Sequence, residues 1–217
     1  MKKIILFILS LTVQVLSQSY QPGDHEVLIM PTAYTMPKGS AYFSDYEVFL
    51  LSSGYAVTST THISAAVLFP VYKGFYNTAT FGIKQNYYRS NGFSGAAFSS
   101  ITVYSGAFLI GNVFSLGTPE RNFNIGVAYY SQLEESRNSQ FVYMLGSKFD
   151  VSRSVSILAE FDGLNYAYAS DFNGGIISLG LRFRSDDITW EIAGIRDLSN
   201  NSGSLLFFPF VKATLIL

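Results

Sequence analysis

The chain has 217 residues, no cysteine and a formal net charge of −1. Charged residues make up 13% of it, against roughly 25% in ordinary soluble domains. The lack of cysteine excludes a disulfide framework, a thiolate metal site and a lipoprotein signal. A pI near 6.1 without a basic cluster excludes a nucleic acid as partner.

The first 17 residues have the pattern of a secretory signal peptide. Lys2 and Lys3 form a basic start, and an apolar run follows from Ile4 to Leu16. Compact residues end the run, so we predict residues 1–17 as the signal, with cleavage after Ser17. The run is too short and too interrupted by polar residues to be a comfortable membrane-spanning helix. The mature chain would carry 12 basic and 15 acidic residues, a net charge of −3.

The segment after the signal contains a turn motif, Pro22-Gly23. We predict residues 18–26 as a short periplasmic leader. The remaining residues, 27–217, are predicted to form a single domain, as their number suggests.

From about residue 40 onward, short stretches alternate apolar with small or charged side chains. The clearest spans Ile176 to Arg184: one face is apolar, whereas the other carries Ser178, Gly180, Arg182 and Arg184. Successive side chains of a strand point to opposite faces, so this stretch is a strand with one apolar and one polar face. An exported chain made of such strands has the pattern of a transmembrane β-barrel.

We predict an all-β fold, an antiparallel up-and-down transmembrane β-barrel of about 12 strands. An even strand count would place both termini of the barrel on the same side of the membrane. The proline in the first stretch makes that strand the weakest of the set. The expected strands are Val27–Thr35, Ser40–Val57, His62–Phe69, Asn77–Tyr87, Gly95–Val103, Ala107–Leu116, Asn122–Ser131, Ser139–Phe149, Ser154–Asp162, Gly174–Arg184, Ile188–Arg196 and Leu205–Leu217.

One hairpin tests the assignment of faces. If Asp186-Asp187 is a two-residue turn, Arg182 lies directly opposite Glu191, and opposed residues share a face. The apolar residues of both strands then also fall together. The alternation of apolar and polar residues in each of the two strands therefore assigns the same inner and outer faces.

Extending this alternation places ten charged side chains inside the barrel. A soluble β-sandwich or small-ligand barrel would instead carry charge outside, and a charge on the lipid face costs about 2–4 kcal/mol at the bilayer midplane. The inward charges balance, which favours an internal ion-pair network over a charge-selective constriction. The predicted lumen-lining residues are Asp45, Glu47, Lys84, Lys148, Glu160, Asp162, Arg182, Arg184, Glu191 and Lys212.

The last stretch, Phe207 to Leu217, is an alternating apolar strand that ends on an apolar residue. It resembles the carboxy-terminal targeting strand of outer-membrane β-barrel proteins, although members of that family usually end in phenylalanine. Residues 31–39 and 55–58 also resemble small barrels of unassigned role from environmental Gram-negative bacteria. The resemblance implies recognition by the barrel assembly machinery and a place in the outer membrane.

Residues for catalysis or metal binding are few. His25 and His62 are the only histidines, and neither lies in a motif with a nucleophile and an orienting group. Glu160 and Asp162 lie two apart on one strand face, where pairing with the neighbouring arginines explains them better than an acid pair for hydrolysis. We therefore predict no catalytic residue, no cofactor and no metal site.

The leading functional hypothesis is an integral outer-membrane barrel of a Gram-negative bacterium with a structural or narrow passive-channel role. Its partners would be outer-membrane lipid, the assembly machinery and, for a channel, a small solute. One alternative is a surface binding or adhesion protein that acts through external loops, of which 163–173 is the longest and most aromatic. An outer-membrane hydrolase is the third.

Overall fold

The structure is a computed structural model that describes residues 21, 23–69, 74–132, 139–164, 175–198 and 207–217. The predicted signal peptide and most of the loop 163–173 lie outside the described residues. Among the described residues no helix is long and apolar enough to span a membrane.

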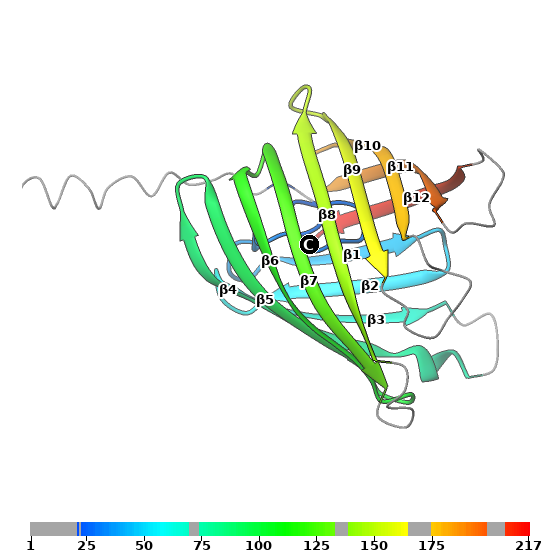
Figure 1. Cartoon of the computed structure of the whole chain (residues 1–217). Helices are drawn as coiled ribbons and strands as arrows, with labels where there is room; N and C mark the ends of the chain where they lie inside the picture. Colours follow the sequence, from blue (N-terminus) through cyan, green and yellow to red (C-terminus); the bar gives the residue numbers. More distant parts are fainter. Residues whose placement is uncertain (1–20, 22, 70–73, 133–138, 165–174, 199–206) are drawn as a thin grey trace, which may run out of the picture.

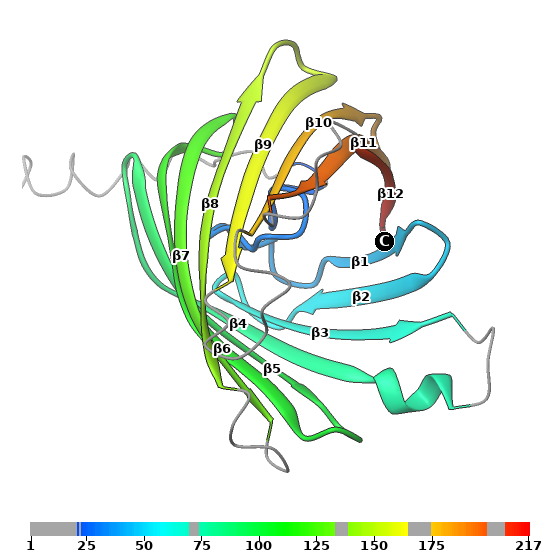
Figure 2. The same ribbon diagram turned by 45° about the vertical axis from the view of Figure 1, so that its right-hand side comes forward.

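Twelve antiparallel strands form a closed barrel, with β1 paired to β12 and each other strand paired to its neighbours in sequence (Figures 1 and 2). This confirms the predicted fold class and strand number. The one described helical turn is the 3-10 helix η1, Phe75–Thr78. The strands are β1 Ala41–Tyr46, β2 Leu50–Ala56, β3 Thr61–Leu68, β4 Thr80–Ser90, β5 Phe93–Thr102, β6 Ala107–Thr118, β7 Arg121–Gln132, β8 Gln140–Asp150, β9 Val155–Leu164, β10 Ile176–Arg184, β11 Ile188–Asp197 and β12 Phe208–Ile216.

Burial alternates along the strands, as expected from side chains that point to opposite faces. In β7, Asn122 and Asn124 are buried inside the wall, whereas Phe123, Ile125 and Val127 are exposed outside it. The same rule holds in β10 and β12. The exposed face of the barrel is therefore largely apolar, and the buried face contains most of the charge.

The predicted number of strands is right because two errors cancel. The stretch expected as one strand, Ser40–Val57, is a hairpin of β1 and β2. Glu47 and Val48 form its turn with φ of 55° and 67°, and the N–H of Phe49 donates to the Tyr46 carbonyl at 3.0 Å. Such turns usually contain Asn-Gly, so Glu-Val gave no sequence signal for a turn here.

The other error is the predicted strand Val27–Thr35, which is wrong. Residues 23–36, here called the plug, lie inside the barrel and are not part of its wall, as Figure 2 shows for the blue segment. Twelve of these fourteen residues are buried; the exceptions are Ile29 and Pro31. The prediction of residues 18–26 as a separate leader is thus corrected for residues 23–26, which belong to the plug.

Candidate functional site

The plug begins with a tight loop whose tip is held by one carboxylate of the wall. The N–H of Val27 donates to the Met30 carbonyl at 2.9 Å, and a β-bridge joins Glu26 to Pro31. At the tip, the N–H groups of Leu28 and Ile29 donate to the Glu160 carboxylate at 2.8 and 3.1 Å. Successive N–H groups that converge in this way make a favourable anion site, so Glu160 fixes the loop.

The plug is also bound to the wall through its main chain. Lys84 Nζ donates to the carbonyls of His25, Thr32 and Tyr34 at 2.9, 3.0 and 2.8 Å. Asn86 donates to the Ala33 carbonyl at 2.8 Å. Because these are main-chain contacts, the wall recognises the path of the plug as well as its side chains.

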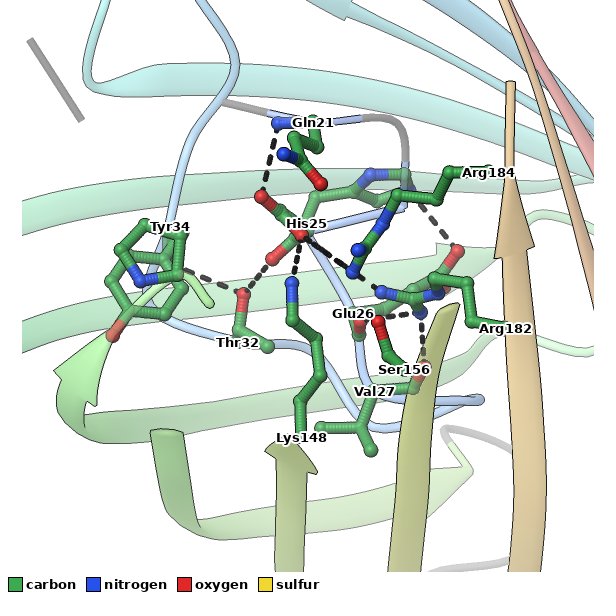
Figure 3. A network of polar contacts seen from close by, with 12 residues as sticks. Gln21, His25, Glu26, Val27, Thr32, Tyr34, Lys148, Ser156, Arg182 and Arg184 are labelled. Atoms are coloured by element: carbon green, nitrogen blue, oxygen red, sulfur yellow. Dashed lines mark hydrogen bonds and ion pairs between the residues drawn. The ribbon is translucent and has the colours of Figure 1, made fainter. Parts of the chain in front are cut away.

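The charged centre of the site joins the plug to β8 and β10 of the wall (Figure 3). Lys148 in β8 and Arg182 and Arg184 in β10 point toward the loop that carries His25 and Glu26. Lys148 binds the Asp24 carboxylate directly, and Arg184 Nη2 and Arg182 Nη1 lie 3.8 and 4.0 Å from it.

The second plug carboxylate, Glu26, pairs with the last strand. Its Oε1 lies 2.5 Å from Lys212 Nζ, and its Oε2 accepts a hydrogen bond from the Tyr46 hydroxyl at 3.0 Å. Lys212 also lies 3.4 Å from Glu191 and donates to the Leu28 carbonyl at 3.1 Å. Lys212 thus links a wall carboxylate to two positions of the plug.

The predicted pairing of Arg182 with Glu191 is confirmed. The two residues are register partners between β10 and β11, and Arg182 Nε lies 2.8 Å from Glu191 Oε1. Arg182 also donates to the carbonyls of Glu26 and Val27. Gly23 has φ +86°, and a Cβ there would lie 2.9 Å from Arg182 Cζ, so glycine lets the plug approach the guanidinium closely.

Apolar packing between the plug and the wall accompanies the polar contacts. Met30 and Ala33 pack with Phe98, Val113 and Met144 from the long strands β5, β6 and β8. Two further clusters join plug and wall residues: Val27 and Leu28 with Leu158, Ala193 and Phe210, and Met36 with Tyr42 and Ala56. Each cluster removes apolar surface from water only while the plug is in place.

Both histidines take part in contacts between the plug and the wall. The N–H of Met36 donates to His62 Nε2 at 2.6 Å, so that nitrogen acts as an acceptor. His25, itself a plug residue, stacks on the Tyr42 ring with centroids 4.2 Å apart. These contacts are structural ones, which hold the two ends of the plug.

Burial and charge shift the pKa values of two plug residues. Burial lowers the pKa of His25 below its ordinary 6.5, although Glu26 opposes the shift. Burial alone would raise the pKa of Glu26, but the attraction of Lys212 and the hydrogen bond from His25 outweigh it, so the net shift is well below 4.5. Glu26 is therefore ionised at neutral pH.

The low pKa of Glu26 predicts how stability depends on pH. Because the folded state holds Glu26 ionised, its contribution is fully present above pH 4.5, the ordinary pKa, and is lost as pH falls toward the folded pKa. We expect Glu26→Gln to lower the unfolding midpoint in urea at pH 7, with a difference from wild type that shrinks steadily below pH 4.5. A constant difference between pH 7 and pH 3 would contradict the ionised pair.

The structure brings eight of the ten predicted lumen residues together inside the barrel. Six residues are buried: Lys84, Lys148, Glu160, Arg182, Glu191 and Lys212. Arg184, whose side chain is 4% exposed, reaches both Asp24 and Asp150. Asp162 is partly buried and shares a hydrogen bond with Glu160.

The inward placement of Asp45 and Glu47 is wrong. Tyr46 is the register partner of Lys212 and faces inward with it, so Asp45, the next residue on the strand, faces outward. Glu47 is an exposed residue of the β1–β2 turn. The alternation was carried through this turn as if it were strand, and Tyr42 and Tyr46 mark the inner face with rings instead of charges.

Sequence reasoning missed the carboxylates of the plug. Two features pointed to them: Pro31 interrupts the expected first strand, and Asp24, His25 and Glu26 crowd polar groups just before it. Neither feature specifies the inside of a barrel. Among the described residues, no group of three histidine or acidic side chains is arranged to hold a metal ion.

Neither the known protein-family models nor the curated proteins contain a match to this chain. Solved structures with a similar fold include two porins. One, described as a KdgM porin in complex with disordered oligogalacturonate, has a TM-score of 0.57 and 8% sequence identity, covering 81% of this chain and 96% of that one. The other is a NanC porin with a TM-score of 0.51 and 10% identity, covering 82% and 97%. The chain therefore has the barrel fold of these porins.

Proposed function

We propose that this chain is an integral outer-membrane protein that forms a narrow passive channel, closed at rest by its own plug. The apolar outer face of the barrel supports the membrane location, because that face would be costly to expose to water. The fold shared with two porins supports a channel.

The observation that carries the proposal is the burial of residues 23–36 inside a wall that is complete without them. The plug is not a strand of the barrel, and β1 closes on β12 independently of it. It can therefore leave the lumen without breaking a hydrogen bond between strands. A structural barrel would need no such separable filling, although a permanently seated plug is the rival outcome of the test below.

The plug is held strongly enough to stay in place at rest. Leaving would separate Asp24 from Lys148 and Glu26 from Lys212, and breaking one buried pair typically costs about 3–5 kcal/mol. A population with the lumen open would thus be small without a change that weakens the plug. We accordingly expect wild-type protein to conduct rarely.

A steric substitution should shift this equilibrium without changing any charge. Gly146 faces the plug, and a Cβ there would lie 2.9 Å from Val27 Cγ2 and 3.0 Å from Met30 Sδ. Overpacking usually costs about 1–3 kcal/mol. We expect Gly146→Val to raise the open fraction in planar-bilayer recordings about tenfold, as a shift of about 1.4 kcal/mol implies.

The matched control is Ser147→Val, the same side chain on the outward face of the same strand. It should leave the open fraction unchanged. If the Gly146→Val protein inserts normally and never conducts, the barrel is a permanently filled structural element and the channel proposal is wrong.

A further inference from the structure

The wall around the plug carries more cations than carboxylates. Four cations form the ion pairs of the charged centre: Lys148, Arg182, Arg184 and Lys212. Among the described residues, the wall carboxylates within ion-pair distance of them are Asp150 and Glu191. The wall by itself is thus short of two negative charges at this level.

The plug supplies those two charges. Asp24 lies among Lys148, Arg182 and Arg184, and Glu26 binds Lys212. The two carboxylates are two residues apart in one short loop. They therefore act toward the wall as a small molecule with two carboxylates would.

The arginines have donor groups that the plug leaves unused. Among the described residues, Arg182 Nη1 and Arg184 Nε and Nη1 are buried without a hydrogen-bond acceptor. The two side chains are 0% and 4% exposed. A guanidinium binds a carboxylate best through two parallel N–H groups, so these nitrogens suit an anion better placed than Asp24.

We propose that Lys148, Arg182, Arg184 and Lys212 form a binding site for small dicarboxylate solutes, which take the places of Asp24 and Glu26 when the plug leaves. This inference rests on the proposed channel function. Exchange of one pair of carboxylates for another keeps the cations paired, so the solute offsets the loss of the plug contacts. In the narrow lumen the same cations attract anions and repel cations.

Planar-bilayer recordings of the full-length Gly146→Val protein test the site directly. Under a tenfold KCl gradient the reversal potential should indicate chloride selectivity. Millimolar glutarate should reduce the chloride current, whereas glutaramide, its uncharged amide, should not. Adding Lys212→Gln should raise the half-blocking glutarate concentration about tenfold, and Arg153→Gln, which changes an exposed arginine in a turn, should not change it.

A second measurement works without conduction. The double variant Asp24→Asn/Glu26→Gln removes both plug carboxylates, so its thermal unfolding midpoint should fall. Glutarate should restore part of the loss, glutaramide should not, and wild type should respond to neither. Open channels that prefer potassium and ignore glutarate, together with no rescue of the double variant, would overturn the inference and leave the channel intact. Glutarate rescue without conductance would instead overturn the channel and keep the anion site.

Discussion

Replacing either Arg182 or Glu191 by alanine is expected to lower the free energy of unfolding by about 3–5 kcal/mol. Both side chains are fully buried, and Arg182 Nη2 and Nε each lie 2.8 Å from Glu191 Oε1. Removal of one partner leaves the other charge in a space with little water. Arg182→Ala also leaves the carbonyls of Glu26 and Val27 without a donor.

The double variant should lose clearly less than the sum of the two single losses, because the second substitution removes a buried charge that the first had already deprived of its main partner. Urea unfolding of the four proteins in detergent micelles measures this difference. Arg121→Ala is a suitable control: this exposed arginine lies over the Phe149 ring, 4.7 Å from its centroid, and its loss should cost about 1 kcal/mol or less. Additive losses for Arg182 and Glu191 would show that the pair is not coupled.

Deletion of residues 211–217 is expected to abolish membrane insertion. These residues form most of β12, which pairs with β11 on one side and closes the barrel against β1 on the other. Their loss would expose two unpaired strand edges in lipid, where each unsatisfied backbone group costs several kcal/mol. It would also remove Lys212 from the plug site.

Fractionation and heat-modifiable migration on gels measure this outcome. The truncated chain should be missing from the outer-membrane fraction, whereas Leu217→Phe, a conservative change after the last residue of β12, should insert normally. Truncated chain at normal levels in the membrane would show that closure does not depend on β12. Recovery of the intact wild-type chain in the soluble periplasmic fraction would contradict the membrane location itself.

Much of the wall was predictable because strands such as β7, β10 and β12 alternate between buried and exposed residues. In β10 and β11 the apolar and polar positions are in phase, so one assumed turn was enough to place Arg182 opposite Glu191. The same alternation placed Lys84, Lys148 and Lys212 on the inner face. Each placement uses only the two-residue repeat of a strand, which is a local property.

The plug was not predictable by the same means. Many of the contacts that hold residues 23–36 have partners 50 or more residues away, such as Lys84 with Tyr34 and Arg182 with Val27. No local repeat specifies such contacts. Asp45 and Glu47 were misplaced for a related reason: the β1–β2 turn adopts a positive-φ geometry with residues that rarely favour it.

The wrong inward placement of Asp45 and Glu47 also concealed the excess of cations on the inner face of the barrel. With Asp45 and Glu47 counted as inward, the predicted lumen held five cations and five carboxylates and appeared complete. Moving the two acidic residues outside leaves five cations against three carboxylates among the predicted positions, Glu160, Asp162 and Glu191. Asp150, which was not among the predicted positions, adds one wall carboxylate, and Asp24 and Glu26 of the plug add two more around the same cations.

The occupation of the lumen by the plug can be measured with a single introduced thiol, because the chain has no cysteine. Ala33 is a plug residue that is fully buried inside the barrel, whereas Arg153 is exposed in a turn. In the folded barrel, Ala33→Cys should react with a maleimide-polyethylene glycol at least a hundredfold more slowly than Arg153→Cys, and the two rates should become equal in denaturing urea. Equal rates in the folded protein would show that residues 23–36 lie outside the lumen.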